Sequence, residues 1–129
     1  MVAEKYLTLE KLETYQLSRE LGEISWSIFK VLVYEEKRLF GYQFVESTDS
    51  VGANIAEGYG RFHYLDKVKF YYNSRGSLLE SRHWFDILVQ RKILIDKNLI
   101  NKYLICYKKV RLTLNGLIKS TMNQKFLIT

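Results

Sequence analysis

Apolar residues recur along the chain at intervals of three and four, which is the period of a helix with one buried face. The first run covers about residues 9–34, with apolar positions at Leu17, Leu21, Ile24, Ile28 and Leu32. The second covers about 39–58, with inward positions at Phe44, Thr48, Val51 and Ile55. The third covers about 64–92 and has Leu65, Val68, Tyr72, Leu79 and Val89. The fourth covers about 97–122 and has Ile100, Tyr103, Tyr107, Val110, Leu114 and Leu117.

The connections between these four runs are short, so neighbouring helices are expected to run antiparallel. The chain contains no proline. We therefore expect the second helix to end at Gly58 and Gly60, in the left-handed cap conformation that glycine adopts without strain. Asp96 or Asn98 is expected to cap the start of the last helix. With 129 residues there is room for one domain. The sequence predicts a single all-α domain, residues 1–129, folded as an antiparallel up-down-up-down four-helix bundle.

Small residues are unusually frequent in the second predicted helix: Ser47, Ser50, Gly52, Ala53 and Ala56. A glycine inside a helix costs about 1 kcal/mol relative to alanine. This cluster predicts that another backbone approaches the helix closely. Near its end, Asn54 and Glu57 lie on one side, and Arg75, Gly76, Ser77 and Glu80 of the third helix offer a matching polar set. We interpret the two sets as a hydrogen-bonded polar layer that joins these helices. Gly76 is expected to allow the helices to approach closely. Arg61, Arg75 or Arg82 is expected to compensate the negative charge of Glu57, which lies at the C-terminal end of its helix. A ligand or nucleic-acid contact is the functional alternative.

The charge of the chain is divided between its two halves. Residues 1–57 contain six Lys and Arg against ten Asp and Glu, a net charge of −4, whereas residues 58–129 contain fourteen against four, a net charge of +10. A basic half of this kind can face a polyanion such as RNA or DNA. Alternatively, the two halves attract each other, within one bundle or between subunits, or the charges form a solvated face.

No constellation of residues favours an enzyme. Glu80 and His83 form one Glu-x-x-His pair, whereas a di-iron bundle needs two such pairs and two further glutamates. Cys106 is the single cysteine, so neither a disulfide nor a multi-cysteine zinc site can form, and we expect a buried structural thiol. We expect no metal, no cofactor and no catalytic residue. The N-terminus lacks the pattern of a secretory signal, and no run of 18 apolar residues is present. We therefore expect a cytoplasmic protein with no membrane partner.

The string Ala53-Asn54-Ile55-Ala56-Glu57-Gly58, followed by Gly60-Arg61 and by Arg75-Gly76-Ser77-Leu78 with Glu80, resembles the bacterial four-helix-bundle proteins of the 23S rRNA intervening-sequence type. The resemblance covers about residues 12–119. It implies a four-helix bundle that assembles as a ring-shaped homopentamer, without enzymatic activity. Some members are encoded within insertions in large-subunit rRNA genes. Related bundles are accessory proteins of the reverse transcriptases of diversity-generating retroelements and bind both enzyme and nucleic acid.

The chain departs from this family before the motif, where Glu46 and Asp49 occupy a region in which members carry a basic pair. Positive charge gathers instead on the last helix, at Lys97, Lys102, Lys108, Lys109, Arg111 and Lys119. A second basic surface, interleaved with aromatic residues, includes Arg61, Lys67 and Lys69. Such a surface can stack on bases or pack between subunits, or its aromatic residues can simply pack in the core. The leading hypothesis is an oligomeric scaffold that binds RNA or DNA. The alternative is an adaptor that binds proteins, such as a reverse transcriptase or another acidic protein.

Overall fold

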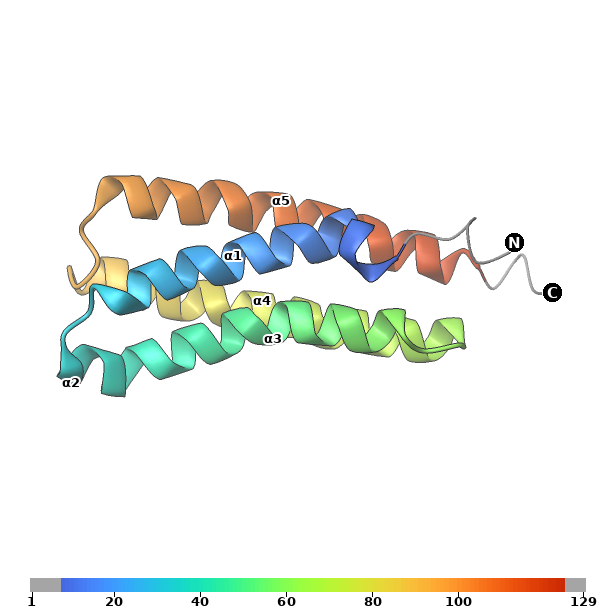
Figure 1. Ribbon diagram of the computed structural model, residues 1–129, viewed down its shortest axis with the longest axis horizontal. Helices are drawn as coiled ribbons and strands as arrows, with labels where there is room; N and C mark the ends of the chain where they lie inside the picture. The colour runs from blue at the N-terminus through green and yellow to red at the C-terminus, as the bar shows by residue number, and fades with distance from the viewer. Residues whose placement is uncertain (1–7, 125–129) are drawn as a thin grey trace.

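A computed structural model describes residues 8–124 of the chain (Figure 1). It begins with a short 3-10 helix, η2 (Leu9–Lys11), and continues with the long helix α1 (Glu13–Lys30). A short helix, α2 (Tyr34–Glu36), runs through a π-helical turn, η3 (Lys37–Gly41), into α3 (Tyr42–Tyr59). The two remaining helices are α4 (Tyr64–Gln90) and α5 (Lys97–Met122). Within the described residues all regular structure is helical, as predicted.

The four long helices form an antiparallel bundle in which successive helices reverse direction (Figure 1). Four pairs of helices make extensive contacts: α1 with α3, α3 with α4, α4 with α5, and α5 with α1. The order around the bundle is therefore α1, α3, α4, α5, and α3 lies diagonally opposite α5. None of the described helices is long and apolar enough to cross a lipid bilayer.

The core runs along the bundle axis and contains side chains from every long helix. The predicted inward positions of α3 are all buried, and four of the six predicted for α5 are buried while Ile100 and Leu117 are half-buried. The stripe predicted for α4 is largely wrong, because Leu65, Tyr72 and Leu79 are exposed. The buried face of α4 consists of Val68, Tyr71, Ser74, Leu78, Ser81, Phe85 and Leu88. Two serines interrupt this face, which is why hydrophobicity alone did not locate it.

The first predicted helix, residues 9–34, is broken in the structure. α1 ends at Lys30, and Val33 has extended backbone angles (φ −79°, ψ 165°) before α2 begins. Leu32 within this break is buried, and the Val33 amide donates to Glu36 Oε1 at 2.9 Å. The turn is thus fixed by one buried leucine and one capping carboxylate. It contains neither glycine nor proline, which explains why the sequence pattern did not reveal it.

The expected left-handed glycine caps at the end of the second predicted helix are wrong. No described glycine has a positive φ; Gly58 lies inside α3 and Gly60 is a right-handed cap residue (φ −77°, ψ −8°). The left-handed cap occurs instead after α4, at Lys92 (φ 59°). There the Lys92 amide donates to the Val89 carbonyl and the Ile93 amide to the Leu88 carbonyl, both at 3.0 Å. These two bonds form a Schellman motif that ends α4.

The last helix begins as predicted. The Asp96 carboxylate accepts hydrogen bonds from the amides of Asn98 (2.9 Å) and Leu99 (3.2 Å). Asp96 is thus the N-cap, and Asn98 lies inside the first turn of α5.

Candidate nucleic-acid interface

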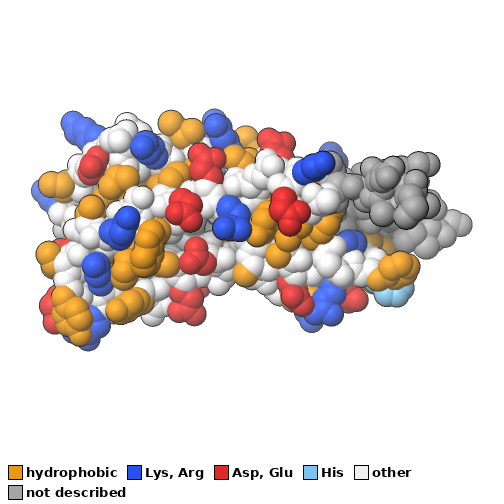
Figure 2. Space-filling model, in the orientation of Figure 1, with side chains coloured by type: hydrophobic (Ala, Val, Ile, Leu, Met, Phe, Trp, Pro, Cys, Tyr) orange, Lys and Arg blue, Asp and Glu red, His pale blue; other side chains and the backbone are white. Residues whose placement is uncertain are grey.

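The basic residues of α5 have no acidic neighbour on their own helix. Residues 97–122 include six lysine and arginine side chains and no aspartate or glutamate. All six are exposed: Lys97, Lys102, Lys108, Lys109, Arg111 and Lys119. In Figure 2, lysine and arginine side chains recur along the edge formed by α5. This helix is the largest concentration of positive charge in the described part of the molecule.

The six cations fall into two rows on α5. Lys97, Lys108 and Lys119 are spaced by 11 residues, close to three full turns, so they lie in a line about 16 Å apart. Lys102 and Lys109 are two turns apart and lie on the side of α5 that faces α1, where they line a groove of about 310 Å³ with Glu20 and Ile24. The remaining cation, Arg111, is nearer to the first row. The predicted α5 cations are therefore divided between an outer row and the α1 side.

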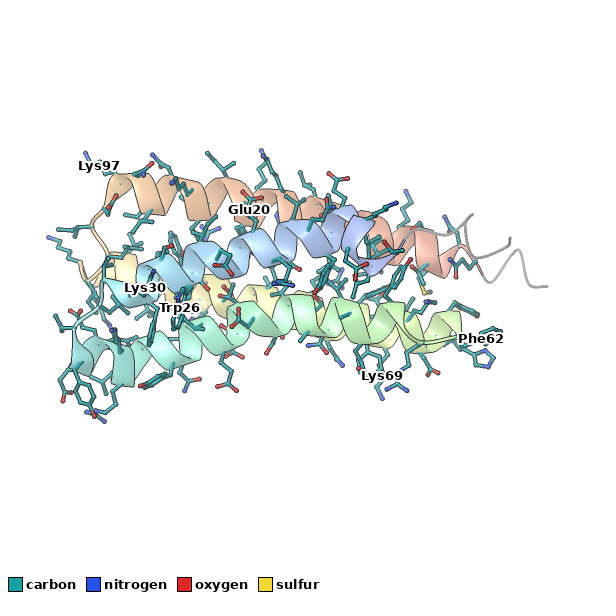
Figure 3. All side chains as sticks on the ribbon, in the orientation of Figure 1. Glu20, Trp26, Lys30, Phe62, Lys69 and Lys97 are labelled. Carbon is teal, nitrogen blue, oxygen red and sulfur yellow. The ribbon has the colours of Figure 1, made fainter. Side chains whose placement is uncertain are left out.

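The second predicted basic surface lies at the turn between α3 and α4, and much of it is engaged within the chain. Arg61 forms an ion pair with Glu57 (2.6 Å), and its guanidinium lies 4.8 Å from the centre of the Phe70 ring. The Lys67 ammonium donates to the Tyr59 carbonyl (2.9 Å). Burial of this side chain lowers its pKa. Lys69 projects from α4 into solvent (Figure 3).

The predicted polar layer between the second and third helices does not form from the residues proposed for it. The Asn54 amide donates to the Ser50 carbonyl of its own helix (2.9 Å), and Glu80 accepts from Trp84 Nε1 of its own helix (3.3 Å). Arg61 compensates Glu57, whereas Arg75 contacts Asn115 Oδ1 of α5 (3.3 Å) and Arg82 pairs with Asp86 (2.9 Å). Ser77 is half-buried and has no side-chain hydrogen bond among the described residues.

Glycines 58 and 76 differ sharply in their surroundings. A Cβ atom on Gly58 would lie 2.8 Å from Tyr71 Cε1, 3.0 Å from the Lys67 carbonyl oxygen and 3.0 Å from Phe70 Cβ. A Cβ atom on Gly76 would meet no atom within 4 Å. Gly58 therefore permits the close approach of α3 to α4, and the close approach expected at Gly76 is wrong.

A different polar layer crosses the core, made of hydroxyl groups. The hydroxyls of Thr48 (α3) and Ser81 (α4) are 2.6 Å apart, and Ser81 is 2.8 Å from the hydroxyl of Tyr103 (α5). Ser74 of α4 donates to the Val51 carbonyl of α3 at 2.7 Å. All these side chains are buried, so each bond is shielded from water. Small polar residues at core positions of the helical period are the sequence signal that could have revealed this layer.

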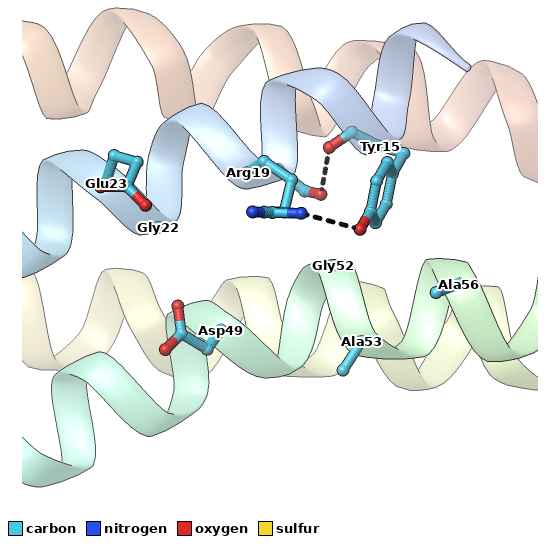
Figure 4. Close-up of a pocket in the computed structure, with 9 residues that line it drawn as sticks. Tyr15, Arg19, Gly22, Glu23, Asp49, Gly52, Ala53 and Ala56 are labelled. Carbon is cyan, nitrogen blue, oxygen red and sulfur yellow. Dashed lines mark hydrogen bonds between the residues drawn. The ribbon is translucent and has the colours of Figure 1, made fainter. Parts of the chain in front are cut away.

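A second groove, of about 330 Å³, lies between α1 and α3 (Figure 4). Tyr15, Arg19 and Glu23 line it from α1, and Asp49 lines it from α3. Small residues form its α3 wall. The close approach of another backbone that was predicted from them is not found at Gly52, where the neighbour nearest to a Cβ is the Ser18 side chain, at 2.9 Å. Arg19 Nη1 donates to the Tyr15 hydroxyl (3.0 Å). Burial and the charge of Glu23 raise the pKa of Asp49, while Arg19 opposes the rise.

The described residues offer little for metal or thiol chemistry. They contain no group of three His, Cys, Asp or Glu side chains that could hold a metal ion. Cys106 is buried, and its thiol donates to the Leu17 carbonyl at 3.5 Å. Burial raises the pKa of this thiol to about 12, with a further contribution from Glu20. At neutral pH the sulfur is therefore protonated and a poor nucleophile.

Comparison with known proteins agrees with the helical bundle. No curated protein matches the chain. A crystal structure of a protein of unknown function from the S23 ribosomal protein family of Bacteroides thetaiotaomicron is similar in fold, with a TM-score of 0.74 and 20% sequence identity. The similarity covers 82% of this chain and 95% of that chain. The family model of the 23S rRNA-intervening sequence protein matches residues 10–116, from η2 through most of α5. The chain therefore belongs to the 23S rRNA-intervening sequence protein family.

Proposed function

We propose that this protein is a non-enzymatic oligomeric scaffold that binds RNA or DNA through the basic surface of α5. The observation that carries the proposal is the composition of that helix: six exposed cations and no acidic residue over residues 97–122. Lysine and arginine on an exposed helix bind phosphates without reading sequence, and the affinity arises mainly from the release of counterions.

The position of α5 in the bundle supports this proposal. The helix diagonally opposite, α3, carries Glu46, Asp49 and Glu57 and no lysine or arginine. The two helices do not share an extensive interface, so their charges are not neutralised by direct packing. The molecule is thus polarised across its width. A polyanion approaching it is attracted to the α5 side and repelled from the α3 side, which favours one orientation of binding.

Exposed hydrophobic side chains support self-assembly. They gather near the end of the bundle where α1 turns into α2, and include Trp26, Val31, Val33, Tyr34, Leu39 and Tyr42 (Figures 2 and 3). Several large exposed apolar side chains in one region are typical of protein interfaces. We propose a homopentamer, as the family resemblance implies. Light scattering should then give about five times the chain mass of 15.4 kDa; a monomer at micromolar concentration contradicts the assembly.

Binding of a fluorescent single-stranded RNA over a salt series tests the nucleic-acid part of the proposal. We expect affinity to fall steeply as salt rises. The double variant Lys108→Gln with Lys119→Gln should reduce the slope of log affinity against log salt by about 1.4, because two phosphate contacts are lost. The matched control neutralises two exposed lysines elsewhere, Lys11 and Lys30, and should leave the slope unchanged. Absence of binding at low salt, or binding that does not depend on salt, would refute the proposal.

A protein-binding adaptor is the second candidate, and the same charge separation favours it. The basic α5 surface is complementary to an acidic protein, such as a reverse transcriptase, or to the acidic α3 of another copy. Affinity capture with and without nuclease distinguishes the two functions. An adaptor keeps its partner after nuclease treatment, whereas a partner held only through nucleic acid is lost.

A further inference from the structure

The groove between α1 and α5 combines an apolar surface with two cations and one acceptor. Its residues are Glu20 and Ile24 of α1 and Lys102, Ile105, Cys106 and Lys109 of α5, and its volume is about 310 Å³. Glu20 projects between the two helices in Figure 3. A volume of this size is at the lower end of the range for small-molecule sites. The groove is therefore large enough for one planar ring with its substituents.

The three charged groups remain available to a ligand. Lys102 and Lys109 are separated by two turns, about 10 Å, and bracket Ile105 on the α5 wall. Among the described residues, neither lysine comes within ion-pair distance of Glu20, since the ion pairs found join other residues. The side chains of Lys102, Lys109 and Glu20 are exposed, and Ile105 is 59% exposed. An aliphatic surface thus lies open between two ammonium groups and a carboxylate.

From this arrangement we infer that the groove binds one nucleotide of a single-stranded nucleic acid, an inference that rests on the proposed function. The base packs against Ile24 and Ile105, and the flanking phosphates contact the ammonium groups of Lys102 and Lys109. The Glu20 carboxylate accepts a hydrogen bond from the exocyclic amine of the base, as carboxylates do with the amine of cytosine. Every lining side chain except Cys106 then has a partner of matching polarity.

This ligand fits better than an anionic amphiphile such as a fatty acid. Both would place negative charge on Lys102 and Lys109 and apolar surface on Ile105. A fatty acid, however, would cover the Glu20 carboxylate with hydrocarbon and give it no donor, which is unfavourable for a charged acceptor. A base with an amino group supplies that donor. Cys106 takes no part in binding, because its thiol is buried and bonded to the Leu17 carbonyl.

The test compares the variant Ile105→Ser with a matched control. Leu112 lies two turns further along α5, outside the groove, and its exposure (54%) is close to that of Ile105 (59%). Fluorescence anisotropy measures binding of labelled oligocytidylate of about twelve nucleotides, which is within the usual range of single-strand site sizes. Inorganic polyphosphate, which has the charge but no base, is the competitor. Circular dichroism confirms that each variant is folded.

We expect Ile105→Ser to weaken oligocytidylate binding by about fivefold, the loss expected when a partly exposed isoleucine no longer buries its apolar surface against the base. Polyphosphate binding and the salt slope should not change, and Leu112→Ser should have less than about a twofold effect. Equal effects of the two substitutions would overturn the groove assignment while leaving the proposed function intact. Absence of oligocytidylate binding by the unaltered protein would instead remove the proposed function. If Ile105→Ser weakens binding of dodecanoate and leaves that of oligocytidylate unchanged, the groove is a site for an anionic amphiphile and our inference is wrong.

Discussion

Substitution of Gly58 by alanine should destabilise the bundle, although alanine is the better helix former. In a helix without tertiary contacts this change gains about 1 kcal/mol. At Gly58 the added methyl would meet the Tyr71 ring at 2.8 Å, the Lys67 carbonyl oxygen at 3.0 Å and Phe70 Cβ at 3.0 Å. The carbonyl is a backbone atom and cannot turn away as a flexible side chain can. Overpacking of this kind costs about 1–3 kcal/mol. With three such contacts we expect the upper part of that range, and hence a net loss of about 1–2 kcal/mol.

The same substitution at Gly76 is the control and should have the opposite sign. Gly76 lies in the middle of α4, is exposed, and has no atom within 4 Å of the position of a Cβ. We therefore expect Gly76→Ala to gain about 0.5–1 kcal/mol. Urea unfolding followed by circular dichroism measures both changes at a common m-value. If the Gly58→Ala variant is as stable as the unaltered protein, the inference that α3 packs closely against α4 at Gly58 is wrong.

Three further predictions concern individual side chains. Lys92→Gly should raise the free energy of unfolding by about 0.5–1 kcal/mol, because Lys92 has a positive φ (59°) that glycine adopts without strain. An unchanged free energy of unfolding in urea denaturation would contradict this. Ser81→Ala should lower it by about 1–3 kcal/mol, since the buried Tyr103 hydroxyl loses its partner; a neutral result would mean that water or rearrangement satisfies that hydroxyl. Asp49→Asn should stabilise the protein near pH 7 and not near pH 3. The pKa of Asp49 is raised in the folded state, so the charged carboxylate makes an unfavourable contribution to folding stability that develops as pH rises through that pKa. Thermal melts of the variant and the unaltered protein at the two pH values measure this contribution. An equal effect of the substitution at both pH values would refute the reasoning.

The candidate site was predictable to the extent that it depends on charge. The basic surface of α5 follows from its sequence, because an amphipathic helix exposes its charged residues and this helix has cations alone. The groove beside Lys102 and Lys109 was not predictable, since it also requires Glu20 and Ile24 of α1, about 80 residues earlier in the chain. Which helix packs beside α5 is a property of the bundle and leaves no periodic signal in either segment.

The internal role of Arg61 and Lys67 shows the same limit. In the sequence both belong to a run of aromatic and basic residues that suggests an external partner, although Arg61 is also one of three arginines expected to neutralise Glu57. In the structure, Arg61 pairs with Glu57 and lies over Phe70, and Lys67 caps the Tyr59 carbonyl. An arginine or lysine side chain can bind either a group of its own chain or another molecule. The geometry of the α3–α4 turn decides between the two, because it places internal partners within reach of both side chains.

The sequence by itself determined the four long helices, the faces that α3 and α5 bury, and the separation of acidic from basic charge. These features depend on local periodicity and composition, which are present in any short window of the chain. Only the tertiary structure decided that α4 buries Ser74 and Ser81, that Gly58 and not Gly76 is a point of close approach, and that α3 and α5 lie diagonally opposite. The physical reason is that a serine or a glycine is equally compatible with a buried or an exposed helical position. Its role depends on the atoms that another helix places against it.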